Sequence, residues 1–238
     1  MKDIAWFRSI CAANGLNLSD EQTSQFEMYR QLLLSANKHV NLISRKDEEN
    51  FYPNHALNSI SLLFGEKLKP DASVLDLGTG GGLPGIPILI IYRGIDLWLL
   101  DSIGKKTSAV SSILDGMQLE RAHVVIGRAE ELSRKREFQR RFDYVMSRAA
   151  GKLEEVAKWS RGFLKNFEAA GGEIIPPGTL IVLKGGEFKD ELNHTRNLKF
   201  VGSVSMIDLS FKGMDEIYNK EKKIVLIRYK ETPAGKMN

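Results

Sequence analysis

Cysteine is almost absent from this sequence, because Cys11 is the only one in 238 residues. A lone cysteine excludes an internal disulfide framework of the kind found in small secreted domains. Long apolar runs are also missing: the longest nearly uncharged one, Gly85 to Tyr92, is far shorter than the roughly 20 residues of a membrane-spanning helix. Asp3 and Arg8 precede any apolar stretch as long as a signal peptide. We therefore expect a cytoplasmic protein with no membrane-embedded part.

Metal-binding patterns are missing as well. No cluster of Cys, His and Asp has the spacing of metal ligands. The histidines are few and scattered along the chain: His39, His55, His123 and His194. An isolated histidine in such a chain is more often structural than catalytic. We expect neither a bound metal nor a metal-dependent reaction.

What the sequence does contain is an ordinary globular composition, with 42% hydrophobic and 27% charged residues and a net charge of +4. The positive charge is concentrated in what we call the basic stretch, five cations within eight positions: Arg134, Lys135, Arg136, Arg140 and Arg141. Such a stretch can neutralise the phosphates of a nucleic acid. Charge alone fits a solvated helix end equally well.

The first 66 residues read as helical. Apolar residues recur at helical spacing between Ile4 and Cys11 and again between Phe26 and Ala36, and Ser19 with Gln22 forms a capping box for the second of these helices. A third helix is predicted from Phe51 to Phe64. We therefore divide the chain into a helical extension, residues 1–66, and an α/β domain, residues 67–238.

After Pro70 the pattern changes to short apolar runs separated by helical candidates, which is typical of a parallel α/β sheet. Helices are predicted near 84–92, 103–117, 130–139 and 152–167. The last two strands have no clear helix between them, so we expect them to pair antiparallel at one edge. The fold predicted is a Rossmann-like, seven-stranded, mostly parallel sheet, with strands at Val74–Leu77, Ile95–Leu100, His123–Gly127, Phe142–Ser147, Thr179–Lys184, Val201–Met206 and Lys223–Tyr229.

The most specific segment is the glycine loop that follows the first predicted strand, residues 78–85. Gly78, Gly80, Gly81 and Gly82 let the backbone turn sharply and allow a ligand to approach closely. Taken literally, the loop contains the dinucleotide fingerprint Gly-x-Gly-x-x-Gly, which is a weak signal by itself. Asp76 and Asp101 end the first two strands, and Asp101 is where the hydroxyl pair of a ribose would lie. A nucleoside ligand is favoured over a tight turn with surface acids.

Five motifs now stand in order along the chain: residues 76–87 (DLGTGGGLPGIP), 99–106 (LLDSIGKK), 127–131 (GRAEE), 147–149 (SRA) and 183–185 (LKG). Their order and spacing resemble the bacterial small-subunit ribosomal RNA methyltransferase G family, also called glucose-inhibited division protein B. The resemblance runs from about Asn41 to Gly185. It implies a class I methyltransferase that uses S-adenosylmethionine to methylate guanine N7 in the 530 loop of 16S ribosomal RNA.

Carried over by position, the family's cofactor contacts fall on five residues: Gly78, Leu83, Ala129, Glu130 and Arg148. Each has a simpler alternative, since Leu83 fits a core position and Glu130 a helix N-terminus. The guanidinium of Arg148 offers two parallel donors to the methionine carboxylate or to a phosphate. The chain departs from the family's upstream His-Phe-Leu-Asp-Ser, because Asn58 stands where the aspartate is usual.

Methylation at guanine N7 requires little from the protein, because N7 has a lone pair and no proton to lose. We therefore predict no catalytic acid, base or nucleophile, with Arg148 as a positioning residue. The predicted RNA contacts are Arg136, Arg140 and Arg141 of the basic stretch and Lys184 at the end of the fifth strand. The predicted partner is 16S ribosomal RNA or the small subunit, bound by a monomer; naked RNA, an assembly intermediate and the mature subunit remain alternatives.

Three competing functions stay open at this point. A methyltransferase of the same fold could act on a small molecule or a protein, with residues 1–66 as a cap. A nicotinamide-dependent oxidoreductase is permitted by the literal fingerprint, although Pro84 and the strand end at Asp76 favour the methyltransferase pattern. A non-catalytic RNA-binding protein would make the glycine loop dispensable.

Overall fold

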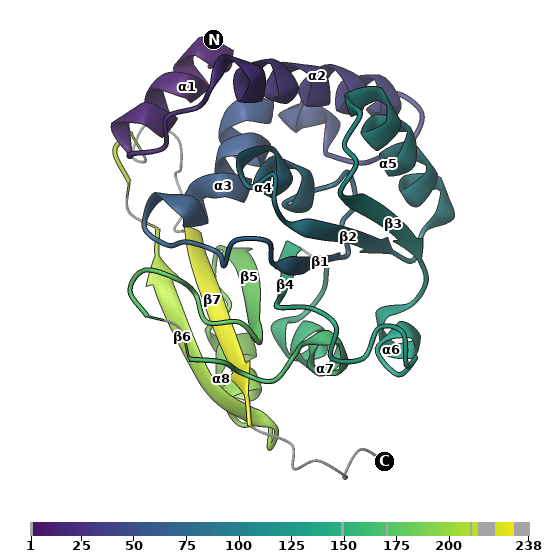
Figure 1. The fold of residues 1–238 in the computed structure, drawn as a ribbon, viewed down its shortest axis with the longest axis vertical. Coiled ribbons are helices and arrows are strands. Elements are labelled where there is room, and N and C mark those ends of the chain that lie inside the picture. Colours follow the sequence, from purple (N-terminus) through teal and green to yellow (C-terminus); the bar gives the residue numbers. More distant parts are fainter. Residues whose placement is uncertain (1, 149, 170, 210, 214–221, 231–238) are drawn as a thin grey trace.

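The computed structural model describes residues 2–148, 150–169, 171–209, 211–213 and 222–230. Within these residues, seven strands form one sheet in the order β3-β2-β1-β4-β5-β7-β6 (Figure 1). Strands β1 to β5 run parallel, whereas β7 is antiparallel to both β5 and β6. The strands are β1 (Ser73–Leu77), β2 (Asp96–Asp101), β3 (Ala122–Ile126), β4 (Tyr144–Arg148), β5 (Thr179–Gly185), β6 (Val201–Asp208) and β7 (Lys222–Tyr229). The predicted sheet is confirmed.

Both faces of the sheet are buried, which explains the nearly continuous apolar runs of its strands. Side chains alternate along each strand, so Val74 of β1 belongs to one hydrophobic core and Leu75 to the other. Helices α4 (Gly85–Ile91) and α5 (Gly104–Met117) cover the first face. Helices α6 (Ala129–Leu132), α7 (Leu153–Phe163) and α8 (Lys189–Arg196) cover the second, lower in Figure 1.

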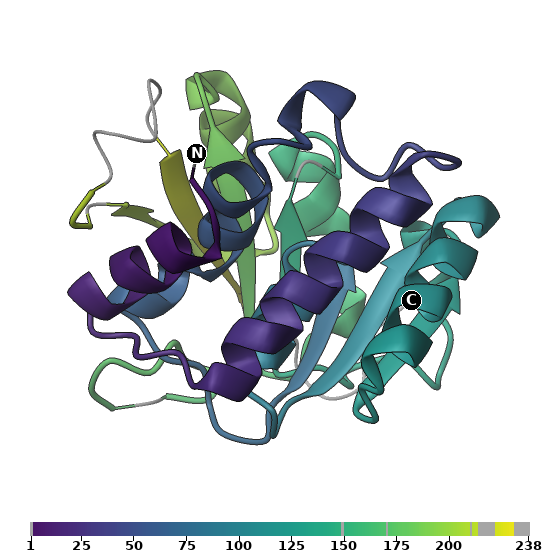
Figure 2. The same cartoon turned by 90° about the horizontal axis from the view of Figure 1, so that it is seen from above.

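Residues 4–64 add a further layer on the first face, which we call the N-terminal layer. Helix α2 (Asp20–Asn37) lies across the same side of the sheet as α5, as Figure 2 shows from above, and α1 (Ile4–Ala13) packs beside it. Phe7, Phe26 and Leu33 share one core with residues of α4 and α5. The predicted capping box at the start of α2 is present, since Ser19 Oγ accepts from the Gln22 backbone N–H. The boundary at residue 66 stays a prediction.

The third predicted helix is wound irregularly. The chain from Phe51 to Phe64 forms a π-helical turn η2 (Phe51–Leu57), a short α3 (Asn58–Ile60) and a 3-10 turn η3 (Ser61–Phe64); another 3-10 turn, η1 (Arg45–Asp47), precedes them. Nearly all of residues 51–62 are buried. Packing on several sides therefore decides the winding of this segment, and the helical periodicity of its sequence does not.

Two predicted helices are too long, and one helix was not predicted. The helix predicted over 130–139 ends at Leu132 and is followed by turns, after which the backbone N–H groups of Arg140 and Arg141 bond to carbonyls at the end of α7. The helix predicted over 152–167 ends at Phe163, where Leu164 becomes extended. Helix α8 was missed because its sequence is polar, with only Leu192 and Thr195 buried. Among the described residues, no helix is both long and apolar enough to cross a membrane.

Candidate functional site

The carboxyl ends of β1 to β4 meet at one edge of the sheet, which we call the carboxyl edge, and the glycine loop lies there. The backbone N–H groups of Gly78 and Thr79 donate to the Leu100 carbonyl at 2.8 and 3.0 Å. Gly78 has a φ of +73°, and a Cβ placed on it would lie 2.5 Å from the Ala150 Cβ. Gly80 also has a left-handed φ, +58°. The loop therefore needs glycine at both positions.

Asp76 lies beneath this loop and is fully buried. Its Oδ2 accepts hydrogen bonds from Thr79 Oγ1 (2.7 Å) and from the Gly85 backbone N–H (2.9 Å), so one carboxylate joins both ends of the loop. Its Oδ1 is buried without a hydrogen-bond partner among the described residues. Burial raises the pKa of Asp76 to about 6, although these hydrogen bonds and the charge of Arg148 oppose the rise. The side chain predicted as a cofactor residue thus shapes the loop from below.

Asp101 ends β2 and faces the loop from the side. Its Oδ2 accepts from the Gly80 backbone N–H and its Oδ1 from the Ile103 backbone N–H, both at 3.0 Å. A cavity of about 290 Å³ opens beside it at the carboxyl edge, lined in part by Gly78, Asp101, Ala129 and Glu130. Four predicted residues from three separate motifs therefore lie around one cavity. Eight residues that were not predicted complete its lining, among them Lys106, Arg128 and Trp159.

Leu83 was predicted as a cofactor contact, but its side chain is buried in the core beneath the first face of the sheet. It does not line the cavity. Its backbone N–H donates to the Thr79 carbonyl at 3.0 Å and so continues the loop into α4. The side chain of Leu83 is thus a core residue, and its contact with the cofactor stays a prediction.

Arg148 ends β4 and contacts the N-terminal layer. Its Nη2 lies 3.2 Å from His55 Nδ1, and its Nη1 lies 3.5 Å from the Asn54 carbonyl. His55 is 7% exposed, and burial, with the nearby charge of Arg148, lowers its pKa to about 4. In the sequence His55 is one of four scattered histidines. Only its place in the upstream motif, residues 55–59, indicates that it has a functional role. Asn58 of that motif is also buried, at the start of α3.

The N-terminal layer also reaches the glycine loop directly. Tyr29 of α2 is fully buried and donates its hydroxyl hydrogen bond to the Gly81 carbonyl at 2.8 Å. Leu42 follows α2, and its carbonyl lies 3.8 Å from where a Cβ on Gly80 would be. Asn37 Oδ1 holds this segment by accepting from the backbone N–H groups of Leu42 and Ile43. The helical extension is therefore part of the walls around the loop.

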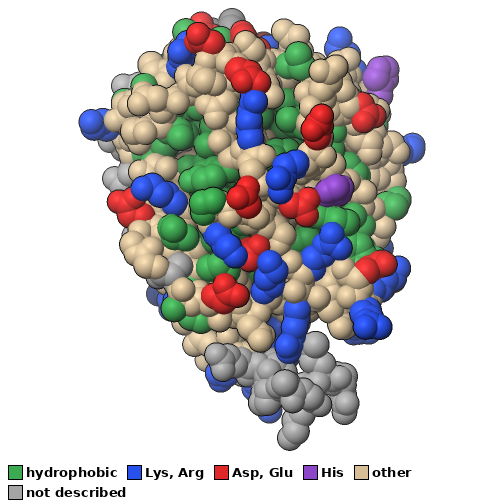
Figure 3. Space-filling model, in the orientation of Figure 1, with side chains coloured by type: hydrophobic (Ala, Val, Ile, Leu, Met, Phe, Trp, Pro, Cys, Tyr) green, Lys and Arg blue, Asp and Glu red, His purple; other side chains and the backbone are tan. Residues whose placement is uncertain are grey.

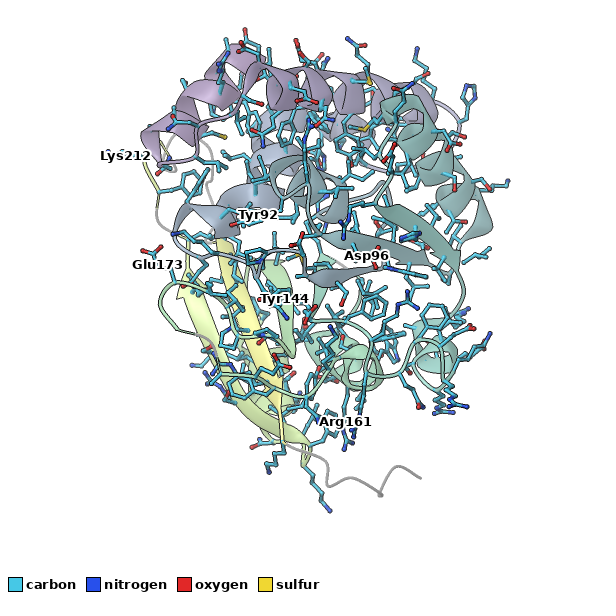
Figure 4. All side chains as sticks on the ribbon, in the orientation of Figure 1. Tyr92, Asp96, Tyr144, Arg161, Glu173 and Lys212 are labelled. Carbon is cyan, nitrogen blue, oxygen red and sulfur yellow. The ribbon has the colours of Figure 1, made fainter. Side chains whose placement is uncertain are left out.

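The basic stretch lies elsewhere. Arg140 and Arg141 precede β4, and the Arg141 guanidinium lies 4.0 Å from the centre of the Trp98 ring near the start of β2. Asp96, labelled in Figure 4, begins β2 and pairs with His123 at 2.9 Å. This is the amino edge of the sheet, opposite the cavity. Arg136 is exposed in the turns between α6 and β4.

Figure 3 shows how positive charge is distributed on one face of the molecule. Lys and Arg side chains gather over its lower part, where Figure 1 places α6 and α7, with acidic side chains among them. Lys184, the fourth predicted RNA contact, is only 14% exposed and pairs with Glu191 at 2.7 Å. This ion pair gives Lys184 a structural partner that was not expected from the sequence.

Comparison with known proteins decides the family. The model of the family described as GidB, rRNA small subunit methyltransferase G, matches residues 22–221. The chain belongs to this family. A relative from Porphyromonas gingivalis, named ribosomal RNA small subunit methyltransferase G, is 37% identical over 89% of each chain. One of the same name from Lachnoclostridium phytofermentans is 31% identical over 99% of this chain and 93% of its own.

Solved structures of more distant proteins share the fold. A fibrillarin/Nop5p complex matches with a TM-score of 0.54 at 15% identity, covering 75% of this chain and 82% of that one. A SAM-dependent methyltransferase from Aquifex aeolicus matches with a TM-score of 0.51 at 12% identity, covering 77% and 95%. The [4+2]-cyclase SpnF matches with a TM-score of 0.54, so the fold alone does not specify the reaction. The family, fold class and enzyme class predicted from the sequence are confirmed.

Proposed function

We propose that this chain transfers a methyl group from S-adenosylmethionine to N7 of a guanine in the 530 loop of 16S ribosomal RNA, as a monomer in the cytoplasm. The observation that supports it most is that three of the family's five motifs, residues 76–87, 99–106 and 127–131, contribute to the lining of one cavity beside the glycine loop. The name of the relatives, which specifies ribosomal RNA of the small subunit, supports the substrate.

The residues around the cavity fit this cofactor. Gly78 presents bare backbone, and Asp101 offers carboxylate oxygens where the ribose hydroxyls would lie. Ala129 and Glu130 line the same cavity and would lie by the adenine. The unpartnered oxygen of Asp76 adds negative potential beneath the loop, which favours a cationic ligand above it. When bound, the cofactor supplies a methyl group on a sulfonium cation.

The protein's part in the reaction is orientation. Guanine N7 attacks with an in-plane lone pair and releases no proton, so the chain needs no general base. Holding the nucleophile, methyl group and departing sulfur in line contributes up to about 7–11 kcal/mol in favourable cases. Cys11 is buried in α1, away from the cavity, and burial raises its pKa to about 12, so it is unsuited to nucleophilic attack. No group of His, Cys, Asp and Glu within the described residues could hold a metal.

We propose that RNA phosphates are bound by the basic stretch, through Arg136, Arg140 and Arg141. The distance between this stretch and the carboxyl edge makes it a contact for RNA flanking the target and not for the target base itself. Lys105 and Arg128 are exposed cations nearer the cavity and form the alternative RNA-binding surface. The salt dependence of RNA binding, measured for variants of each surface, distinguishes the two.

Mass-spectrometric mapping of 7-methylguanosine in 16S ribosomal RNA tests the function, using cells with and without this protein. We expect the modification to disappear from the 530 loop without the protein and to return with the wild-type chain or with Gly65→Val. Gly78→Val should not restore it, because its Cβ would collide with Ala150, whereas Gly65 has open space and an ordinary φ. An unmodified 530 loop in wild-type cells would refute the proposal.

A further inference from the structure

His55 and Arg148 are 93 positions apart, yet they form a side-chain contact between the N-terminal layer and the end of β4. Arginine only donates hydrogen bonds, so His55 Nδ1, 3.2 Å from Arg148 Nη2, must be the acceptor. The histidine is therefore neutral and carries its proton on Nε2. The Nε2 N–H that this tautomer carries is buried and has no hydrogen-bond partner among the described residues.

The backbone that carries His55 is held by its own helical turn, and the imidazole lies against the ring of Phe51, with centroids 6.3 Å apart. The Ser59 hydroxyl donates to the His55 carbonyl at 2.7 Å, and both residues are buried. Phe51, at the start of η2, packs edge-on against the ring of Tyr29 with centroids 5.7 Å apart. Tyr29 in turn bonds to Gly81 of the glycine loop. His55 is thus fixed relative to the loop before any ligand binds.

Arg148 lies where its charge acts on the glycine loop as well. Its positive charge opposes the rise in the pKa of both Asp76 and Tyr29, so it is electrostatically close to both groups. Its Nη1 also reaches the Asn54 carbonyl in the turn that carries His55. The guanidinium thus lies where the N-terminal layer meets the glycine loop, although Arg148 is not among the residues that line the cavity.

We propose that His55 is a positioning residue: its neutral Nδ1 orients the Arg148 guanidinium beside the glycine loop, so the N-terminal layer supplies part of the cofactor site. This inference rests on the proposed function. A neutral acceptor suits the task, because a carboxylate there would cancel the positive charge that Arg148 presents to an anionic ligand group. The charged groups that face His55 are Arg148 of β4, Asp47 of η1 and Lys222 of β7.

The test compares variants of the full chain by calorimetric titration with S-adenosylmethionine. His55→Leu removes the acceptor and keeps the bulk apolar, whereas His55→Asn places an oxygen on the same γ carbon that bears Nδ1. A hydrogen bond to a charged group predicts a roughly 10- to 100-fold weaker Kd for His55→Leu. We expect His55→Asn to stay within about threefold of the wild type.

A double-mutant cycle separates positioning from general stability. In an Arg148→Ala background, His55→Leu should change the cofactor Kd by less than about twofold, because its only route to the ligand is gone. Ile60→Ala is the matched control: it removes fully buried bulk from α3 of the same segment, and its aliphatic side chain makes no hydrogen bond or ring contact with His55, Arg148 or Tyr29. It should lower the melting temperature while leaving the cofactor Kd near the wild-type value.

Three results would overturn the inference: additive effects of His55→Leu and Arg148→Ala, equal losses for Ile60→Ala and His55→Leu, or a wild-type Kd in Arg148→Ala. None of them depends on RNA. The wild-type chain could bind the cofactor and the double-mutant cycle could give the expected non-additivity while no 16S ribosomal RNA is methylated. In that case the substrate proposed above is wrong and the positioning role stands.

Discussion

Replacing Asp76 by asparagine tests how the glycine loop is supported. The amide oxygen of the new side chain can still accept from Thr79 Oγ1 and from the Gly85 N–H, while the buried charge disappears. The amide nitrogen then takes the place of Oδ1, which has no partner among the described residues. The cost of burying this amide nitrogen without a partner does not depend on pH. The pH dependence of the free energy of unfolding therefore reports the effect of the Asp76 charge alone.

The magnitude follows from the pKa of Asp76, which burial raises from 3.8 to about 6. The folded state therefore holds its proton more tightly than the unfolded state, and this group destabilises the fold as pH rises from about 4 through 6. At about 1.4 kcal/mol for each pH unit between the two pKa values, the loss is about 3 kcal/mol in total, of which about 2 kcal/mol falls between pH 4 and 7. Asp76→Asn should gain that stability relative to the wild type.

His55 contributes with the opposite sign. Its pKa falls from 6.5 to about 4 in the folded state, so the wild-type protein gains stability as pH rises from about 4 to 6.5. The two contributions nearly cancel in the wild type and separate in the single variants. Relative to the wild type, His55→Asn should lose about 3 kcal/mol over the range in which Asp76→Asn gains.

Urea unfolding at pH 4, 5, 6 and 7 measures these differences by linear extrapolation. The unfolding free energy of Asp76→Asn minus that of the wild type should rise by about 2 kcal/mol between pH 4 and 7. If this difference in unfolding free energy stays constant or falls with pH, burial does not destabilise the carboxylate of Asp76. The charged side chain beneath the glycine loop would then not destabilise the fold.

Three further outcomes are expected. Gly80→Val should abolish calorimetric binding of S-adenosylmethionine, because a β-branched residue cannot adopt a φ of +58° without strain, whereas Gly65→Val should bind normally. Neutralising Arg136, Arg140 and Arg141 together should weaken RNA binding and flatten its salt dependence while leaving cofactor affinity unchanged; an unchanged salt slope would assign these residues to a solvated face. The single-turnover methylation rate should vary little between about pH 6 and 9, because no proton leaves N7, and a clear rise near pH 6.5 would instead place a histidine base in the mechanism.

Local patterns in the sequence were enough to predict the sheet and the glycine loop. Short, nearly continuous apolar runs indicate which strands are buried on both faces, and left-handed backbone angles at Gly78 and Gly80 follow from residues that are adjacent in the chain. Parallel strands bring their carboxyl ends together, so the order of the motifs alone places Asp101, Ala129 and Glu130 around one cavity. The irregular winding over 51–64 was not predicted, because packing overrides the helical period of that sequence. Helix α8 was not predicted, because its sequence is polar.

Packing between distant segments accounts for the rest. A charge count along the chain cannot tell at which edge of the sheet the cations emerge, and the fold puts Arg140 and Arg141 opposite the cavity. Full burial of Asp76, and with it a raised pKa, requires the loop to close above the carboxylate. The contact of His55 with Arg148 exists only because the N-terminal layer folds onto the sheet. Local sequence thus limits which residues could hold a cofactor, and long-range packing selects those that face it and those that support it from behind.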